Sequence, residues 1–318
     1  MLIQIIILIA GLILILMGAN WLVDGSSSIA RRFGISEFVI GLTIVGIGTS
    51  APEMVVSFLS SFQGKSDMAV GNIVGSNIFN TLMILGATAL VAPVVITKSN
   101  LKKDIPLNIA VTVLLILLGK SASLFGLGAT DSLSRAEGGI LLLIFAIYLW
   151  NSFRSGREET DEGVKDETKP LLATLMIIGG LAGLIFGGRL FVNSATQIAL
   201  IAGLSEKFIA ITIMAAGTSM PELATCVVAA YKGQGQLALG NILGSNISNI
   251  LLILGGSALI HPLSFNSISD MDLGIMTVSA ILILLSAISF KKEKLDRVEG
   301  VIFIGLQIAY MAYLIISI

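Results

Sequence analysis

The sequence contains a hexapeptide that occurs twice. Residues 48–53 read Gly-Thr-Ser-Ala-Pro-Glu, and residues 217–222 read Gly-Thr-Ser-Met-Pro-Glu. A second motif keeps the same register: Gly-Asn-Ile-Val-Gly-Ser-Asn-Ile-Phe-Asn at residues 71–80 returns as Gly-Asn-Ile-Leu-Gly-Ser-Asn-Ile-Ser-Asn at residues 240–249. Because 169 positions separate both pairs without a gap, the chain is predicted to consist of two copies of one structural unit.

The composition around these motifs is that of a membrane protein. Of the 318 residues, 55% are hydrophobic and 12% are charged, whereas soluble domains carry about 25% charged residues. A single Cys and a single His exclude a disulfide framework and a Cys/His zinc cluster. The net charge of −1 offers no basic surface to nucleic acid, and the absence of a nucleophile–base pair argues against an enzyme.

Ten membrane spans are expected if each needs about 20 apolar residues. Their approximate limits are 2–24, 37–62, 68–92, 104–119, 135–153, 170–195, 206–231, 237–260, 271–290 and 298–317. Each repeat then holds five spans, an odd number, so the second repeat crosses the membrane in the opposite sense. The predicted fold is an all-α polytopic membrane protein of two inverted five-helix repeats, in which helices 2 and 7 are broken.

The distribution of positive charge predicts the orientation. With the N-terminus outside, 14 of the 19 Lys and Arg residues fall in cytoplasmic loops, where such residues accumulate. The chain divides into a first repeat at 1–153, an acidic cytoplasmic linker at 154–169 and a second repeat at 170–318, with both termini outside. The six carboxylates of the linker lack the spacing of a calcium loop, so we interpret it as a flexible connector. The expected location is the cytoplasmic (inner or plasma) membrane, with multiple spans in the lipid bilayer.

Two acidic residues fall deep inside predicted spans. Glu53 and Glu222 each lie about 16 residues into an apolar segment. An ionisable side chain at that depth costs from about 2.5 kcal/mol upward and usually has a transport function. Inverted repeats also place substrate sites near the midplane, where the two halves meet. Both observations predict that the two glutamates form a cation site.

The residues before each glutamate support this hypothesis. Pro52 and Pro221 lack the N–H group that a regular helix needs, so they are predicted to break spans 2 and 7 and to free backbone carbonyls. Thr49 and Thr218 lie four residues before the glutamates, near the same helix face. Carbonyl, hydroxyl and carboxylate oxygens are the ligands that Na+ and Ca2+ prefer.

Spans 3 and 8 carry a polar stripe on otherwise apolar helices. Its residues recur every four positions and therefore share one helix face; they are Asn72, Ser76, Asn80, Asn241, Ser245 and Asn249. Asn77 and Asn246 point about 100° away from the stripe, which favours structural hydrogen bonding. Gly71, Gly75, Gly240 and Gly244 are interpreted as packing residues.

The two motif pairs resemble the alpha repeats of the sodium/calcium exchangers in the calcium/cation antiporter superfamily. The resemblance covers nearly the whole chain and is closest to compact prokaryotic members. It implies that Glu53 and Glu222 bind calcium together with Thr49 and Thr218. It further implies sodium ligands at these same four residues and at Gly46, Ser50, Ser76, Asn80, Ala215, Ser219, Ser245 and Asn249. Some relatives, including potassium-dependent exchangers, have Asp where this chain has Asn249, which argues against potassium coupling.

The resemblance implies an antiporter that exchanges Na+ for Ca2+ by alternating access, with no cofactor and no obligate protein partner. Exchange driven by protons, or of other divalent cations, is the main alternative. Spans 3 and 8 contain no Asp or Glu, whereas proton-coupled relatives have additional acids there, which favours sodium. A passive cation channel is a third possibility, disfavoured because the chain has no tetrameric filter sequence.

Overall fold

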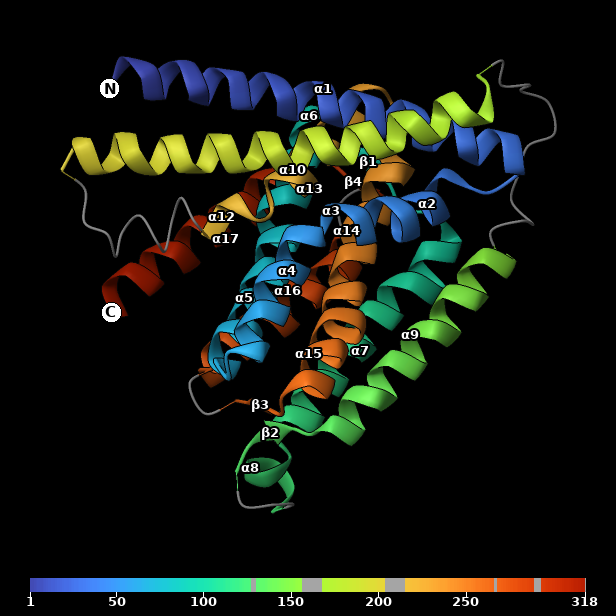
Figure 1. Cartoon of the computed structure of the whole chain (residues 1–318). Coiled ribbons are helices and arrows are strands. Elements are labelled where there is room, and N and C mark those ends of the chain that lie inside the picture. Colours follow the sequence, from blue (N-terminus) through green and yellow to red (C-terminus); the bar gives the residue numbers. More distant parts are fainter. Residues whose placement is uncertain (127–129, 156–167, 204–214, 266–267, 289–292, 318) are drawn as a thin grey trace.

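The computed structural model describes residues 1–126, 130–155, 168–203, 215–265, 268–288 and 293–317, and nearly all of them are helical (Figure 1). Seven described helical stretches are long and apolar enough to cross a membrane, and one bent pair makes an eighth. The prediction of an all-helical, multi-pass membrane protein is confirmed. The count of ten remains a prediction, since residues 206–214 of span 7 and most of the linker, 156–167, lie outside the described residues.

The helical elements follow the order of the predicted spans. Those of the first half are α1 (Leu2–Phe33), α2 (Glu37–Ile40), η1 (Gly41–Val45), α3 (Gly46–Thr49), α4 (Ala51–Phe62), α5 (Ser66–Phe79), η2 (Asn80–Ile84), α6 (Leu85–Val91), η3 (Asn100–Asp104), α7 (Ile105–Gly119), α8 (Ser121–Phe125) and α9 (Arg135–Ser155). Those of the second half are α10 (Pro170–Ile201), α12 (Ala215–Gly217), α13 (Met220–Tyr231), α14 (Gly235–Ser248), η5 (Asn249–Leu254), α15 (Gly255–Ile260), α16 (Asp270–Ile288) and α17 (Arg297–Ser317).

The first helix of each half is longer than predicted. α1 continues past residue 24 to Phe33 and α10 continues past residue 195 to Ile201. α1 ends where Gly34 takes the left-handed conformation (φ 61°) and its N–H bonds to the Ala30 carbonyl, a common helix terminator. The predicted ends were wrong because they followed hydropathy, and a helix can continue through polar residues beyond its apolar run.

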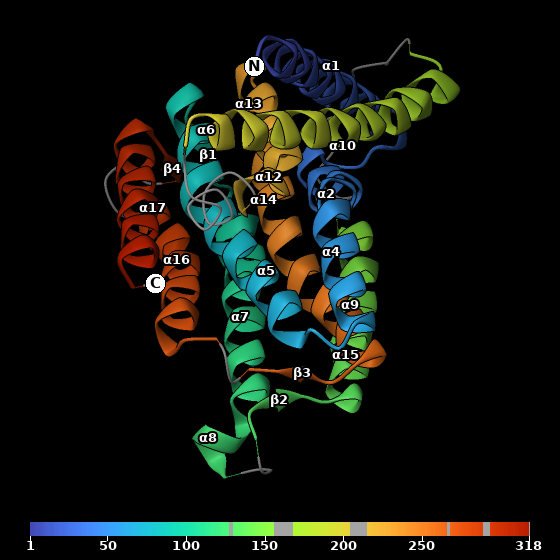
Figure 2. The same cartoon turned by 60° about the vertical axis from the view of Figure 1, so that its left-hand side comes forward.

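α1 and α10 lie side by side across one end of the bundle (Figures 1 and 2). Glycines let their backbones touch: a Cβ on Gly18 would come within 2.7 Å of the Gly180 carbonyl oxygen, and a Cβ on Gly180 within 2.6 Å of the Leu22 nitrogen. Small residues permit this close packing in membranes, where no hydrophobic force drives helices together. The two helices therefore form one packed unit.

The predicted break in span 2 is confirmed and lies at Ser50, two residues before Pro52. Ser50 leaves helical geometry (φ −77°, ψ 9°), and the helix on either side of it bends by 48°. Pro52 then sits in the first turn of α4, where a missing N–H costs nothing because that turn has no helical acceptor. Ser219 and Pro221 have the corresponding places at the start of α13.

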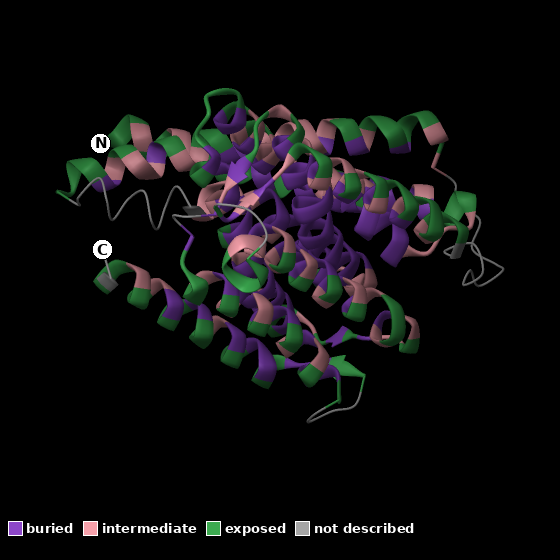
Figure 3. Cartoon of the chain, turned by 90° about the horizontal axis from the view of Figure 1, so that it is seen from below, coloured by how far each residue is buried: buried purple, intermediate pink, exposed green. Residues whose placement is uncertain are grey.

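The centre of the bundle is polar as well as buried. Figure 3 shows the buried residues concentrated in the middle of the molecule. The span from Gly235 to Ile260 is the core helix, with 94% of its apolar window buried, compared with 22% for the span of α1. Spans 3 and 8 both change to π-helical geometry, at Asn80 and at Asn249. Such turns often occur at functional sites.

Two short antiparallel strand pairs, which the all-α prediction did not include, join the halves. β1 (Val94–Val95) pairs with β4 (Lys294–Leu295), and β2 (Ser132–Leu133) pairs with β3 (Leu263–Ser264). The first pair connects the end of α6 to the start of α17, and the second connects the end of α15 to the start of α9. The strands satisfy backbone groups at the ends of the bundle.

A larger residue at the α1–α10 contact is expected to destabilise the fold. Gly18→Ala would force the two backbones apart, because the new Cβ would come within 2.7 Å of the Gly180 carbonyl oxygen, and overpacking of this kind costs about 1–3 kcal/mol. Thermal unfolding in detergent should show a lower midpoint for this variant. Gly188→Ala is the matched control, because a Cβ on Gly188 meets nothing within 4 Å; an equal loss in the control would contradict the packing argument.

Candidate cation site

The two glutamates lie at the two helix breaks. Glu53 is in the first turn of α4 and Glu222 is in the first turn of α13, so each carboxylate is near the positive end of a helix dipole. Each residue is 1% exposed. Neither has an ion pair with a cationic side chain among the described residues. Two acidic groups are thus buried with no resident countercharge.

Reciprocal hydrogen bonds connect the breaks across the two halves. The Ser50 hydroxyl donates to Glu222 Oε1 (3.0 Å), and the Ser219 hydroxyl donates to Glu53 Oε1 (2.9 Å). Thr49 lies beside Glu222 and Thr218 beside Glu53. The serine of each repeat therefore holds the carboxylate of the other, an arrangement that spacing along one helix could not predict.

The polar stripes of spans 3 and 8 face these breaks. Ser76 donates to Glu53 Oε1 (3.4 Å), and the Asn72 amide donates to the Glu53 backbone carbonyl (3.2 Å). In the other half, Ser245 donates to the Gly46 carbonyl oxygen (3.1 Å). The predicted ligand carbonyl of Gly46 is thus already next to a predicted ligand hydroxyl.

Four asparagines fix one another between the two stripes. Asn80 Nδ2 donates to Asn246 Oδ1 (3.2 Å), and Asn249 Nδ2 donates to Asn77 Oδ1 (2.9 Å). Asn77 Nδ2 donates to the Asn246 carbonyl (3.2 Å), and Asn246 Nδ2 donates to Thr81 (3.0 Å). Asn77 and Asn246 thus make the structural hydrogen bonds that the sequence favoured. They also orient the side chains of Asn80 and Asn249. The amide nitrogen of each donates a hydrogen bond, whereas the amide oxygen of each accepts none from the described residues.

Four buried oxygens at this centre have no hydrogen-bond donor among the described residues. They are Glu53 Oε2, Glu222 Oε2, Asn80 Oδ1 and Asn249 Oδ1. A buried polar atom without a partner costs about 1–3 kcal/mol. All four atoms are acceptors, two are on carboxylates, and they come from both repeats in equivalent pairs. This donor set suits a hard cation such as Na+ or Ca2+.

Other predicted site residues have less direct positions. Thr49 donates to Asn241 Oδ1 (3.1 Å) and to the Val45 carbonyl (3.0 Å), so its hydroxyl proton has protein partners. Ala215 begins α12, and its expected role as a carbonyl ligand stays a prediction.

Two repeat-related amides of the polar stripes, Asn72 and Asn241, also contact equivalent positions of the neighbouring spans. Asn72 donates to Ser57 (3.0 Å), and Asn241 donates to the Cys226 sulfur (3.2 Å). Ser57 and Cys226 occupy equivalent positions of the two repeats. This equivalence is the sequence feature from which the two contacts could have been predicted. Cys226 is a buried free cysteine.

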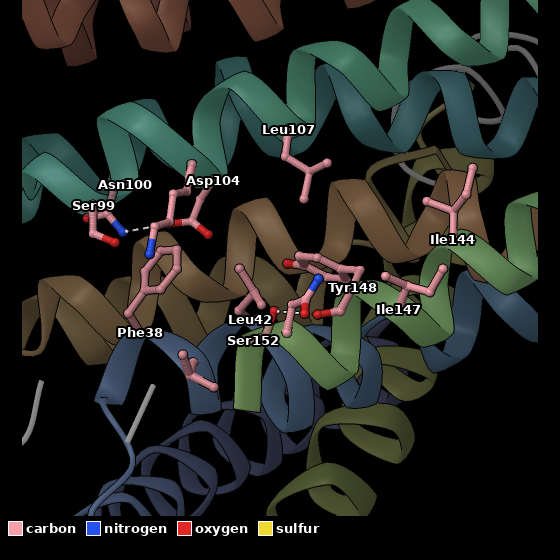
Figure 4. Close-up of a pocket in the computed structure, with 13 residues that line it drawn as sticks. Phe38, Leu42, Ser99, Asn100, Asp104, Leu107, Ile144, Ile147, Tyr148 and Ser152 are labelled. Atoms are coloured by element: carbon pink, nitrogen blue, oxygen red, sulfur yellow. Dashed lines mark hydrogen bonds between the residues drawn. The ribbon is translucent and has the colours of Figure 1, made fainter. Parts of the chain in front are cut away.

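A separate cavity of about 270 Å3 lies between α2, α7 and α9 (Figure 4). Figure 4 shows Phe38 and Leu42 on one side and Tyr148 on another, while the Asn100 amide donates to Asp104 (3.3 Å). None of the predicted ligands lines this cavity. It is therefore distinct from the candidate cation site.

The helical membrane fold and the buried anionic centre define an integral membrane protein of the cation-transporting class. The sequence profile of the sodium/calcium exchanger protein family matches residues 3–154 and 172–316. The chain belongs to this family. The family accounts for Na+ and Ca2+ as transported ions and for antiport, and it requires no cofactor.

Individual relatives agree over nearly their full lengths. The inner membrane protein YrbG of Escherichia coli is 36% identical, with 97% of this chain and 95% of that protein covered. The sodium/calcium exchanger MaX1 of Methanosarcina acetivorans is 33% identical, with 98% and 97% covered. The structure of the sodium-calcium exchanger NCX_Mj soaked without Na+ and Ca2+ has a TM-score of 0.85 at 32% identity and covers 98% of this chain and 99% of that one.

The amide cluster generates a prediction for stability. Asn246→Leu removes the acceptor of Asn80 and the donor to Thr81, and about 1–3 kcal/mol is lost for each buried group left unpaired. Thermal unfolding in detergent without Ca2+ should show a clearly lower midpoint. Ser248→Ala serves as the control, since Ser248 bonds only within its own helix, to the Ser245 carbonyl (3.2 Å). A midpoint of Asn246→Leu equal to that of the control would refute a structural role for the cluster.

Proposed function

We propose that this chain is an antiporter that exchanges Na+ for Ca2+ at a single site centred on Glu53 and Glu222. The observation that carries the proposal is the set of four unpartnered buried oxygens, two of them on carboxylates. Membership of the sodium/calcium exchanger family supports the choice of ions. The proposal includes ten spans, both termini outside and a location in the cytoplasmic membrane.

Charge explains why the two ions exclude each other. Glu53 and Glu222 together supply a charge of −2, which one Ca2+ neutralises. Sodium ions need the same oxygens, with neutral oxygens added from Thr49, Ser50, Ser76, Asn80, Gly46, Ala215, Thr218, Ser219, Ser245 and Asn249. If the site holds either Ca2+ or Na+ but not both, each conformational change carries only one kind of ion across the membrane. Alternation of the two ions then produces exchange.

The surroundings of the site favour sodium over protons as the counter-ion. Spans 3 and 8 supply hydroxyls and amides, with no Asp or Glu within residues 68–92 and 237–260. Neutral oxygens bind a cation but do not carry a proton in the physiological range. The vesicle experiment described below also tests proton exchange.

Repeat-related helix pairs are arranged differently in the two halves, which supports alternating access. α1 packs against α13. The equivalent pair is α10 and α4, and there a cavity of about 220 Å3, lined by Val55, Arg189 and Thr218 among others, lies between the two helices. Val55 is 45% exposed, whereas Ala224, at the equivalent position on α13, is 9% exposed. The α10–α4 pair is separated by a cavity, whereas the α1–α13 pair is packed together. Such a difference is expected of inverted repeats if the two halves exchange conformations during transport.

The cavity reaches the helix breaks. Pro52, Gly217, Thr218 and Pro221 all line it, so it leads from the surface towards the carboxylates. In the predicted orientation, Val55 and Arg189, which also line the cavity, lie in the outer half of the membrane. This arrangement supports a state that is open to the outside.

Transport in reconstituted vesicles tests the function. Vesicles loaded with Na+ and diluted into Na+-free medium are expected to accumulate labelled Ca2+, and collapse of the gradient should abolish uptake. Glu53→Gln and Glu222→Gln should each reduce uptake at least about 100-fold, because each removes half of the charge that balances Ca2+. Retained Ca2+ exchange in both variants would contradict the site assignment.

The same vesicles separate the alternatives. A pH gradient that replaces the Na+ gradient and drives equal uptake would favour proton exchange. Ca2+ conductance in a planar bilayer that does not depend on a Na+ or H+ gradient would favour a channel. Circular dichroism and size-exclusion profiles of both glutamine variants should match the parent protein, which confirms that loss of transport does not reflect loss of fold.

An ion pair on the closed side predicts how the two states are balanced. Lys232, after the end of α13, bonds to Asp24 on α1 at 2.7 Å. The equivalent positions of the other half, Gln63 and Asn193, are neutral. The pair thus stabilises this state only. Because both side chains are partly exposed, the contribution is about 0.2–1 kcal/mol.

Asp24→Asn is therefore expected to shift the population away from the outward-open state by up to about fivefold. In a Cys226→Ser, Val55→Cys background, an impermeant maleimide added outside should label the new thiol more slowly once Asp24 is replaced. The charge-swapped pair Asp24→Lys with Lys232→Asp should restore the rate. Unchanged labelling in Asp24→Asn would rule out a contribution of the ion pair to the balance.

A further inference from the structure

The last helix carries a buried amide that the proposed exchange site does not use. α17 turns one narrow stripe towards the bundle, formed by Glu299, Phe303, Gln307 and Tyr310, each at most 9% exposed. Gln307 is halfway along this 21-residue helix and 2% exposed. Its Oε1 atom has no hydrogen-bond partner among the described residues. An acceptor is thus buried at mid-membrane depth with no donor.

Gln307 borders a cavity of about 130 Å3 between α5 and α17. The opposite wall of this cavity is formed by Asn72, Gly75 and Ser76 of α5. A Cβ on Gly75 would meet nothing within 4 Å, whereas one on the equivalent Gly244 would overlap the Leu42 carbonyl. The two glycines occupy equivalent positions of the repeats, but Gly244 allows close packing against Leu42, whereas Gly75 borders open space.

This cavity shares a wall with the cation site. Ser76 donates to Glu53 Oε1 and Asn72 to the Glu53 backbone carbonyl, and both residues also line the cavity. Tyr310, a further lining residue, is engaged with Asp272 at 2.7 Å. Gln307, whose Oε1 atom has no partner among the described residues, thus lines a cavity that the side chain of Ser76 connects to the buried carboxylate of Glu53.

We propose that this cavity is an accessory subsite for partly hydrated Na+, bound by Gln307 Oε1 and the Ser76 hydroxyl oxygen. The inference rests on the proposed function. The described lining residues include no carboxylate, and protein Ca2+ sites commonly use carboxylates, so Na+ is the better-suited ion. A volume of about 130 Å3 accommodates the ion with a few waters at about 30 Å3 each. The nearby charge of Glu53 favours a cation over water alone.

The test compares Gln307→Leu with Met311→Leu in proteoliposomes. Met311 lines the same cavity without an oxygen ligand, so its replacement controls for packing. We measure the Na+ concentration that gives half-maximal Ca2+ transport, and separately the Ca2+/Ca2+ exchange that proceeds without Na+. Gln307→Leu is expected to raise the half-maximal Na+ concentration about fivefold, the effect of one lost polar interaction. Its Ca2+/Ca2+ exchange should stay within about twofold of the parent, and Met311→Leu should match the parent in both.

A parental Na+ dependence in Gln307→Leu would overturn the proposal, and so would an equal loss of Na+-driven and Ca2+/Ca2+ exchange. If Gln307→Leu aggregates in size-exclusion chromatography, Gln307→Asn decides instead, because it withdraws the oxygen by one methylene and keeps the amide. Failure of the proposed function has a different signature: the parent protein itself shows no Na+-driven Ca2+ transport. In that event, binding of labelled Na+ to purified parent and Gln307→Leu still tests the subsite, and equal binding refutes it.

Discussion

The structure depends on two carboxylates buried without a resident countercharge. Glu53 and Glu222 are held in place by serines of the opposite repeat, at 2.9–3.0 Å. These bonds satisfy one oxygen of each carboxylate and leave the other without a donor among the described residues. Since burial of an uncompensated charge is costly, the proposed binding of a cation would stabilise this centre. The helix breaks, the polar stripes and the amide cluster all serve to build this incomplete site.

The inverted repeat explains why so much of the site comes in pairs, and the deviations from symmetry are the more informative feature. Asn72 contacts Ser57 while Asn241 contacts Cys226, so the supporting contacts are conserved in form between the halves. The packing of α1 on α13 has no equally close counterpart between α10 and α4. The proposed alternating access depends on this asymmetry between two repeat-related helix pairs.

The sequence predicted the fold class, and it singled out Glu53 and Glu222, which the structure buries at the two helix breaks. It did so because an acid and a proline inside an apolar span are costly, and their recurrence in one register is hard to explain by packing alone. It was less successful at boundaries. The ends of α1 and α10 were placed too early, because hydropathy does not report where backbone hydrogen bonding stops.

What the sequence determined by itself is the set of oxygen-bearing residues and their spacing along each apolar helix, since both are read directly from the residues. Only the tertiary structure decided which serine holds which glutamate, which face of each asparagine remains free, and which of two equivalent glycine pairs packs against a helix and which borders a cavity. These features depend on contacts between the repeats, roughly 165–200 positions apart in the chain. One helix carries no information about its partner's position, so the chemistry of the site could be foreseen and its connectivity could not.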